Sequence, residues 1–197
     1  MIFASSAAVY GNIEQFPVTE DVRMAPISPY GASKAAGEFY CRAFEESHGI
    51  EVVSLRYFNV YGPRQSSSQY SGVISIFARR ILRQEPLVIF GDGSQTRDFV
   101  FVDDVVDGTI RALEENYQSR IFNIASATET TILGLARITQ ELAGARSRLE
   151  FQPARPGDPY RGLADVTAAR RELRFVPKTS LRDGLLETIK WYSEKPH

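Results

Sequence analysis

The sequence predicts an α/β protein built on a twisted, largely parallel sheet. Its 197 residues, of which 43% are hydrophobic and 24% charged, are enough for one domain with a substantial core. Short apolar runs rich in β-formers alternate with segments of helical periodicity, which is typical of α/β proteins. The expected strands are MIF, EVVSLRYF, PLVIF, FVFV and RIFNIA.

The first expected helix covers residues 28–48 and ends at Gly49, since glycine commonly terminates helices. Its apolar residues recur at helical spacing: Ala32, Ala36, Phe39 or Tyr40, Ala43 and Phe44. Later helices are expected at 72–84, 102–115, 131–144 and 180–194.

Polar residues stand at the expected beginnings of these later helices. An aspartate is expected to cap the helix at 102–115, and Thr131 precedes the next one, which ends at Gly144. Ser180, followed three residues later by Asp183, is close to a capping box. The stretch at 62–72 reads as a mobile polar loop.

Composition excludes several function classes. The formal net charge of −1 gives no basic excess for nucleic acid. One cysteine and two histidines cannot form a disulfide or a Cys/His metal cluster, which fits a reducing cytoplasm. No basic leader and no apolar run of roughly 20 residues is present, so we expect neither export nor membrane insertion.

Tyr30 and Lys34 are four residues apart near the beginning of the first expected helix. This spacing places both side chains on one face, with the ammonium close enough to favour the phenolate form of the tyrosine. Taken alone, the spacing is weak evidence, because such pairs also occur by chance. Upstream, FASSAAVYG reads as a strand running into a small-residue turn, the kind of strand end where open α/β sheets hold ligands. Ser6 would then face Tyr30 across a cleft.

Four other residues are expected to be structural. Cys41 reads as a buried helix residue without a nucleophilic role, because no histidine stands near it in the sequence. Tyr10 and Tyr61 are expected to pack at turns or in the cleft, and Trp191 in the core.

Five ordered motifs resemble the extended short-chain dehydrogenase/reductase family of nucleotide-sugar epimerases and dehydratases, most closely its UDP-glucose 4-epimerase-like branch. The motifs are SSAAVYG, SPYGASK, LRYFNVYGPRQ, VIFGDGSQTRDFVFVDDVV and RPGDPYRGLAD. The resemblance implies the C-terminal part of a doubly wound Rossmann-type sheet together with a smaller α/β substrate-binding region. Residues 1–62 would complete the dinucleotide-binding domain, and residues 63–197 would mainly bind the nucleotide sugar, with some elements returning to the Rossmann sheet.

The resemblance assigns a catalytic set. Tyr30 would be the base, Lys34 would bind the nicotinamide ribose and lower the tyrosine pKa, and Ser6 would hydrogen-bond the sugar hydroxyl that is oxidised. In the family's epimerases, the tyrosinate takes the proton of the sugar 4-hydroxyl while the C4 hydride passes to bound NAD⁺. The 4-keto sugar then rotates and receives the hydride on its other face.

The resemblance also assigns binding residues. Tyr57 and Phe58 would form the wall near the nicotinamide, although strand packing alone would also explain Phe58. The nucleotide-sugar ligands would be Asn59 and the arginines Arg97 and Arg155 at the diphosphate, Val88 and Phe90 at the uracil, Asp158 at the ribose, and Gly162 beside the sugar 2-position.

One family feature is missing. No GxGxxG or GxxGxxG spacing occurs among the 14 glycines, and the acidic residue that would bind the adenosine ribose is also absent. The chain therefore looks like the last three-fifths of such a protein.

Several functions stay open. The chain could belong to a UDP-hexose or UDP-N-acetylhexosamine 4-epimerase, to a dehydratase or decarboxylase of the same family, or be a remnant that binds UDP-sugar or self-associates without turnover. Dehydration needs an added acid/base pair after Ser6, where this sequence has Ala7 and Ala8, so epimerisation is favoured. The resemblance also implies a homodimer formed through the helix that carries Tyr30. Phe39, Tyr40 and Phe44 would form the contact surface, and their burial in the core of the monomer is the alternative.

Overall fold

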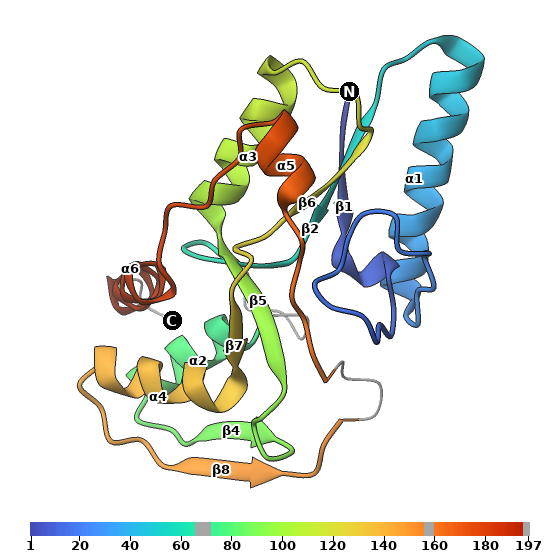
Figure 1. The fold of residues 1–197 in the computed structure, drawn as a ribbon. Coiled ribbons are helices and arrows are strands. Elements are labelled where there is room, and N and C mark those ends of the chain that lie inside the picture. Colours follow the sequence, from blue (N-terminus) through green and yellow to red (C-terminus); the bar gives the residue numbers. More distant parts are fainter. Residues whose placement is uncertain (66–71, 156–159, 195–197) are drawn as a thin grey trace.

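The computed structural model describes residues 1–65, 72–155 and 160–194. Its main sheet has three parallel strands in the order β1–β2–β6 (Figure 1). These are β1 (Ile2–Ser6), β2 (Val53–Tyr57) and β6 (Ile121–Ile124). All three come from runs that the sequence predicts to be strands, and the parallel α/β class is confirmed.

Helices cover both faces of this sheet. Helix α1 (Pro29–His48) lies on one side of it, and α3 (Val102–Glu114) and α5 (Thr167–Glu172) lie on the other (Figure 1). Between the sheet and the latter two helices lies an apolar cluster that includes Leu55 and Phe122. A short 3-10 turn, η1 (Ala7–Val9), follows β1 directly.

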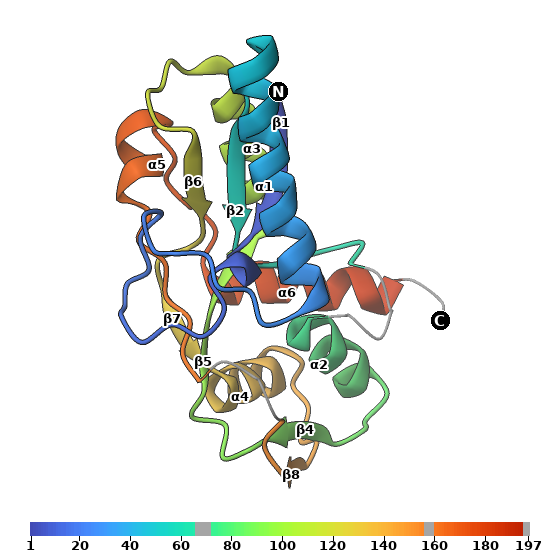
Figure 2. The same cartoon turned by 90° about the vertical axis from the view of Figure 1, so that its right-hand side faces the viewer.

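The remaining elements form a second region below this sheet in Figures 1 and 2. Strand β5 (Thr96–Phe101) pairs in parallel with β3 (Asn59–Tyr61) and antiparallel with β7 (Glu129–Thr131). A separate parallel pair joins β4 (Leu87–Phe90) to β8 (Leu149–Gln152). The helices here are α2 (Val73–Leu82), α4 (Ile132–Leu142) and α6 (Leu181–Glu194).

All five expected helices form, but one cap differs. Thr131 and Ser180 accept hydrogen bonds from the backbone amides of Gly134 and Asp183, as N-cap side chains do. The aspartate cap expected for α3 is wrong, because Phe101 occupies its N-cap without a side-chain bond. Asp104 instead accepts the backbone amides of Lys178 and Thr179, at 2.9 and 3.1 Å, and so ties α3 to the segment that leads into α6.

Helix α1 lies unusually close to β1 and η1. A Cβ atom on Gly31 would come within 2.5 Å of the Ala8 carbonyl oxygen, and one on Gly37 would overlap the Phe3 ring. The buried face of α1 is therefore built from small residues and one carboxylate: Gly31, Ala35, Glu38 and Cys41. Burial raises the pKa of the Cys41 thiol, which fits the inert role expected for it.

The larger apolar residues of α1 face solvent instead. Phe39 is 61% exposed, Tyr40 69% and Phe44 48%. Burial of this stripe in the core of the monomer, one of two interpretations open from sequence, is therefore wrong. The helical spacing was right, but spacing cannot tell a core from another apolar surface.

The other structural expectations have mixed outcomes. Tyr10 and Tyr61 are buried, and burial raises the pKa of Tyr10 to about 12. Trp191 is only half-buried and packs beside Tyr192. Most of the expected polar loop at 62–72, residues 66–71, lies outside the described residues. Among the residues that are described, no helix combines the length and apolar character needed to cross a bilayer.

Candidate active site

An open cleft of about 1450 Å³ lies where the main sheet meets the second region. The carboxyl ends of β1 and β2 and the first turn of α1 form one part of its wall, and α2, β3, β4 and β5 form much of the rest. Open α/β sheets hold their ligands at such strand ends. Nine of the twelve predicted site residues line the cleft: Ser6, Tyr30, Tyr57, Phe58, Asn59, Val88, Phe90, Arg97 and Arg155.

Ser6 and Tyr30 are brought to this cleft by two local structures. Ser6 ends β1 and caps η1, where its hydroxyl accepts the Ala8 amide at 3.2 Å. Ser28 caps α1 by accepting the Gly31 amide at 3.0 Å, which begins the helix immediately before Tyr30. Tyr30 lines the cleft and is 57% exposed, so a ligand in the cleft can reach its side chain.

Lys34 lies beside this pair but does not line the cleft. Its ammonium nitrogen is 5.7 Å from the centre of the Tyr30 ring and donates a 2.8 Å hydrogen bond to the Ala4 carbonyl. The predicted helical neighbourhood of Tyr30 and Lys34 is therefore present. The bond to Ala4 also fastens α1 to β1 next to Ser6.

The stretch 57–59 passes along the cleft from the end of β2. The Tyr57 hydroxyl makes a 2.9 Å hydrogen bond with that of Thr109 on α3, and the Asn59 amide donates to the Asp98 carbonyl at 3.0 Å. Phe58 lines the cleft and also packs against the cluster around Val9, so packing and ligand contact are compatible for this residue.

Arginines gather where β4 and β5 reach the cleft. The guanidinium of Arg155 stacks on the Phe90 ring at 3.7 Å, a cation–π contact that orients it. Arg97 on β5 donates to the Thr96 carbonyl at 2.6 Å. Arg80 of α2, which sequence reasoning missed, also lines the cleft. Guanidinium groups of this kind suit an anionic ligand, although that of Arg80 is also paired with Glu85 at 4.0 Å.

The last two predicted site residues are not shown to line the cleft. Asp158 lies outside the described residues. Gly162 is not among the residues that line the cleft, and a Cβ atom there would meet the Arg97 Cα and the Thr96 carbonyl oxygen, both at 3.6 Å. This is ordinary van der Waals contact, so a side chain at position 162 would lie against Arg97.

A buried carboxylate supports the Arg97 wall of the cleft. Asp98 accepts the Ser126 amide and hydroxyl, both at 2.8 Å, and the Ala164 amide at 3.2 Å. Burial raises the pKa of Asp98, and these hydrogen bonds counteract the shift. Asp98 thus joins β5 to the segment that carries Gly162.

Three glutamines also line the cleft and were not predicted: Gln65, Gln95 and Gln152. Gln65 and Gln95 stand inside two of the motifs, YGPRQ and GDGSQTRDF. Their position beside assigned residues could have been used to predict them as cleft residues. Gln152 and Arg80 carry no such signal, because only the tertiary fold brings β8 and α2 to this place.

The described residues fit only part of a dinucleotide. Tyr30, Tyr57 and Phe58 offer a polar and aromatic wall at the strand ends, with the Lys34 ammonium beside it, which suits a nicotinamide ribose. The sequence carries no glycine-rich turn for the pyrophosphate.

Comparisons with known proteins agree with this geometry. The chain is 38% identical over 192 residues to the UDP-glucose 4-epimerase of Mycolicibacterium smegmatis, covering 98% of this chain and 61% of that protein. It superposes with a TM-score of 0.93 and 39% identity on a UDP-N-acetylglucosamine 4-epimerase from Methanobrevibacter ruminantium solved with UDP-N-acetylmuramic acid, covering 98% of this chain and 62% of that one. UDP-glucuronic acid decarboxylase 2 of Arabidopsis thaliana is 35% identical over 98% of this chain and 44% of its own length.

The chain thus spans about three fifths of the length of the epimerases it matches. The model of the NAD dependent epimerase/dehydratase family matches residues 1–125, well over half of the chain. The cleft lined by Ser6, Tyr30 and the arginines agrees with this match. The chain belongs to the NAD dependent epimerase/dehydratase family.

Proposed function

We propose that this chain supplies the catalytic and nucleotide-sugar-binding residues of an NAD-dependent 4-epimerase acting on a UDP-hexose or UDP-N-acetylhexosamine. The observation that carries the proposal is a single cleft that joins Ser6 and Tyr30 at one end to Arg97, Arg155 and Phe90 at the other. Such a cleft can hold a sugar beside a base while its diphosphate is paired with guanidinium groups.

Each residue would have a distinct task. The Tyr30 oxygen would take the proton from the sugar 4-hydroxyl, and the Ser6 hydroxyl would hydrogen-bond the same sugar oxygen. Lys34, Tyr57 and Phe58 would hold the nicotinamide end of NAD, which when bound supplies the hydride acceptor for C4.

The remaining residues would bind the nucleotide. Arg97 and Arg155 would pair with the diphosphate, where Asn59 would add a hydrogen bond. Val88 and Phe90 would contact the uracil, and Asp158 would bind the ribose hydroxyls. Apart from Asp158, which lies outside the described residues, these residues come from the second region, so the proposed substrate binding and proton transfer are supplied by different parts of the fold.

Within the family, the turn after Ser6 favours epimerisation over dehydration. Ala7 and Ala8 form η1 there, so this turn offers no side-chain acid or base. Elimination of water needs a proton donor and acceptor beyond the tyrosine.

The test uses a fusion protein. The 197 residues are joined to the part of the Mycolicibacterium smegmatis UDP-glucose 4-epimerase that they do not match, and conversion of UDP-glucose to UDP-galactose is measured. We expect turnover by the fusion protein. A fusion protein that binds NAD and UDP-glucose without converting the sugar would support the non-catalytic alternative. Release of a dehydrated sugar from UDP-glucose, or of a decarboxylated sugar when UDP-glucuronic acid is supplied instead, would identify the other enzyme classes.

Substrate size gives a further prediction. The resemblance places Gly162 beside the sugar 2-position, and a Cβ atom there would make only ordinary contacts with Arg97 and Thr96. The fusion protein should therefore accept UDP-N-acetylhexosamines as well as UDP-hexoses. Gly162→Tyr should lower kcat/KM for the N-acetylated sugar about 10-fold or more through steric exclusion and change that for UDP-glucose by less than about twofold. Gly162→Ala is the matched control and should leave both values unchanged. Equal losses on both sugars in the tyrosine variant would show that position 162 acts only through the fold.

We also infer a homodimer through α1, and the exposed stripe of Phe39, Tyr40 and Phe44 supports it. Contiguous exposed apolar residues of this kind mark interaction surfaces. Phe44→Glu should convert dimer to monomer in light scattering, because a carboxylate in an apolar contact loses its hydration. Glu46→Gln, on the same exposed helix surface, is the control. A wild-type protein that is monomeric at high concentration, and whose solubility Phe44→Glu does not change, would contradict the inference.

A further inference from the structure

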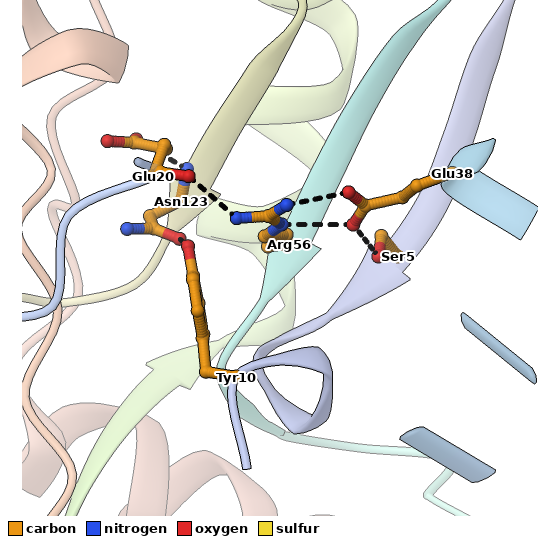
Figure 3. A network of polar contacts seen from close by, with 6 residues as sticks. All are labelled: Ser5, Tyr10, Glu20, Glu38, Arg56 and Asn123. Atoms are coloured by element: carbon orange, nitrogen blue, oxygen red, sulfur yellow. Dashed lines mark hydrogen bonds and ion pairs between the residues drawn. The ribbon is translucent and has the colours of Figure 1, made fainter. Parts of the chain in front are cut away.

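Three elements of the main sheet layer meet at a buried ion pair between Glu38 of α1 and Arg56 of β2 (Figure 3). Only 4% of the Glu38 side chain and 2% of the Arg56 side chain are exposed. The pair is bidentate, with Arg56 Nε 3.0 Å from Glu38 Oε1 and Nη2 2.7 Å from Oε2. The Ser5 hydroxyl of β1 donates to Glu38 Oε1 as well, so the carboxylate is bonded to both strands.

The other side of Arg56 is held by a separate set of contacts. Its Nη1 donates to the Glu20 carbonyl at 2.9 Å, and its guanidinium lies 4.7 Å from the centre of the Tyr10 ring. The Tyr10 hydroxyl donates to Asn123 of β6 at 2.6 Å (Figure 3). Arg56 is therefore also held by residues outside α1, and Glu38 is the α1 side chain that bonds to it.

Glu38 is also in register with the candidate catalytic residues. It follows Lys34 by four positions and Tyr30 by eight, so the three lie along the same side of α1. Lys34 bonds to the Ala4 carbonyl and Glu38 bonds to the Ser5 hydroxyl, the two residues that precede Ser6. The bonds that attach α1 to β1 therefore lie immediately before Ser6, the residue that Tyr30 would face across the cleft.

We propose that Glu38 is a positioning residue that sets the rotation and the axial place of α1, and thereby holds Tyr30 and Lys34 in register with Ser6. The inference rests on the proposed function of those three residues. Apolar contacts are non-directional and permit small slides of a helix over a sheet, whereas a bidentate pair with an added hydroxyl bond has one geometry. A buried ion pair of this kind often adds little net stability compared with an apolar pair of the same volume. We therefore assign the pair a role in the placement of α1 and not in stability.

The test separates position from stability with a double variant. Glu38→Gln alone leaves the Arg56 charge without its partner, so it should lower the melting temperature of the 197-residue chain. Glu38→Leu combined with Arg56→Met replaces both partners with apolar groups, so much of the lost thermal stability should return. Tyr10→Phe is the matched control: it removes one hydrogen bond from the same buried network but leaves the attachment of α1 intact.

Turnover is then measured in the fusion protein. We expect the double variant to have a kcat about 10²-fold below that of the unsubstituted protein, which is the loss that follows when a reacting group is misplaced by about 1 Å. KM for UDP-glucose should be nearly unchanged, because the arginines of the cleft are not altered. Tyr10→Phe should lower the melting temperature yet keep kcat. A double variant that regains both stability and kcat would overturn the proposal, as would a Tyr10→Phe protein whose kcat falls in proportion to its stability.

Hydrogen exchange on the 197-residue chain distinguishes a failure of this inference from a failure of the proposed function. The amides of residues 31–38 should exchange about 10-fold faster in the double variant, while those of β2 and β6 keep their protection, because only the attachment of α1 is loosened. This pattern, with no turnover in the unsubstituted fusion protein, would refute the enzyme assignment and leave the attachment of α1 through Glu38 standing. Unchanged exchange in α1 would refute the positioning role whatever the turnover.

Discussion

Tyr30→Phe is expected to reduce epimerase turnover in the fusion protein by about 10³-fold, within the range that a positioned general base contributes. The substitution removes the hydroxyl that lies in the cleft with Ser6 but keeps the aromatic ring, so the shape of the cleft is preserved. Affinity for UDP-glucose should therefore change by less than about threefold, because Arg97 and Arg155, the proposed ligands of the diphosphate, are unchanged.

The measurement is kcat and KM with UDP-glucose and with its N-acetyl analogue, accompanied by calorimetric titration of UDP. Lys34→Ala should lower turnover too and in addition weaken retention of NAD, because its ammonium would hold the nicotinamide ribose. Tyr40→Phe, a tyrosine on the same helix that does not line the cleft, is the control and should be silent. Near-normal epimerisation by Tyr30→Phe would eliminate the assignment of the base.

The second large effect is expected for the cofactor. The 197-residue chain by itself should not retain NAD through purification and should show no epimerase turnover, although it carries Ser6, Tyr30 and Lys34. In this fold the pyrophosphate rests on amides at a helix N-terminus reached through a glycine turn. Contacts to the nicotinamide ribose alone contribute about 1–3 kcal/mol, against a cost of several kcal/mol for immobilising a flexible dinucleotide.

Absorbance and mass spectrometry of the supernatant after denaturation measure any bound dinucleotide. We expect weak UDP binding to persist in the same preparation, because β4, Arg97 and Arg155 are all present. Stoichiometric NAD released from the 197-residue chain, or turnover that follows this species through chromatography, would contradict the prediction and show that another segment or subunit provides the phosphate site.

The same preparation should tend to aggregate. Among the described residues β1 pairs only with β2, so its outer edge is open, and open edges invite pairing with other chains. Helix α3 also presents a stripe of exposed apolar side chains, Val106, Ile110 and Leu113. Fusion should improve solubility if the added segment covers these surfaces.

The main sheet and its long helices could be predicted because their patterns are local. The apolar runs at β1, β2 and β6 are bounded by turn residues, and α1 has a serine at its beginning and a glycine at its end. Strands β3, β7 and β8 and helix α5 were missed because they are only three to six residues long and depend on partners distant in sequence.

The candidate site was predictable residue by residue from motifs, but its supports were not. In the sequence, Glu38 looks like an ordinary polar residue on the surface of a helix. Arg56 interrupts an apolar strand, and nothing in the sequence indicates that it pairs with a residue 18 positions earlier. The apolar stripe of α1 is recognisable in the sequence, but its exposure is not. Only the structure shows that the small-residue face of α1 packs against β1, which leaves the stripe in solvent. Pairings across the fold are properties of tertiary structure, which a one-dimensional pattern does not encode.

The parallel pair β4–β8 forms a sheet of its own, separate from the strands that carry Ser6 and Tyr57. Its two strands bring Val88, Phe90 and Gln152 to the cleft, and Arg155 follows three residues after the end of β8. Under the proposed function, substitutions in this pair would change which base the cleft selects and leave the helix that bears Tyr30 in place. Residues 87–90 with 149–155 would then be an exchangeable cassette for redirecting the fusion protein toward other nucleotides.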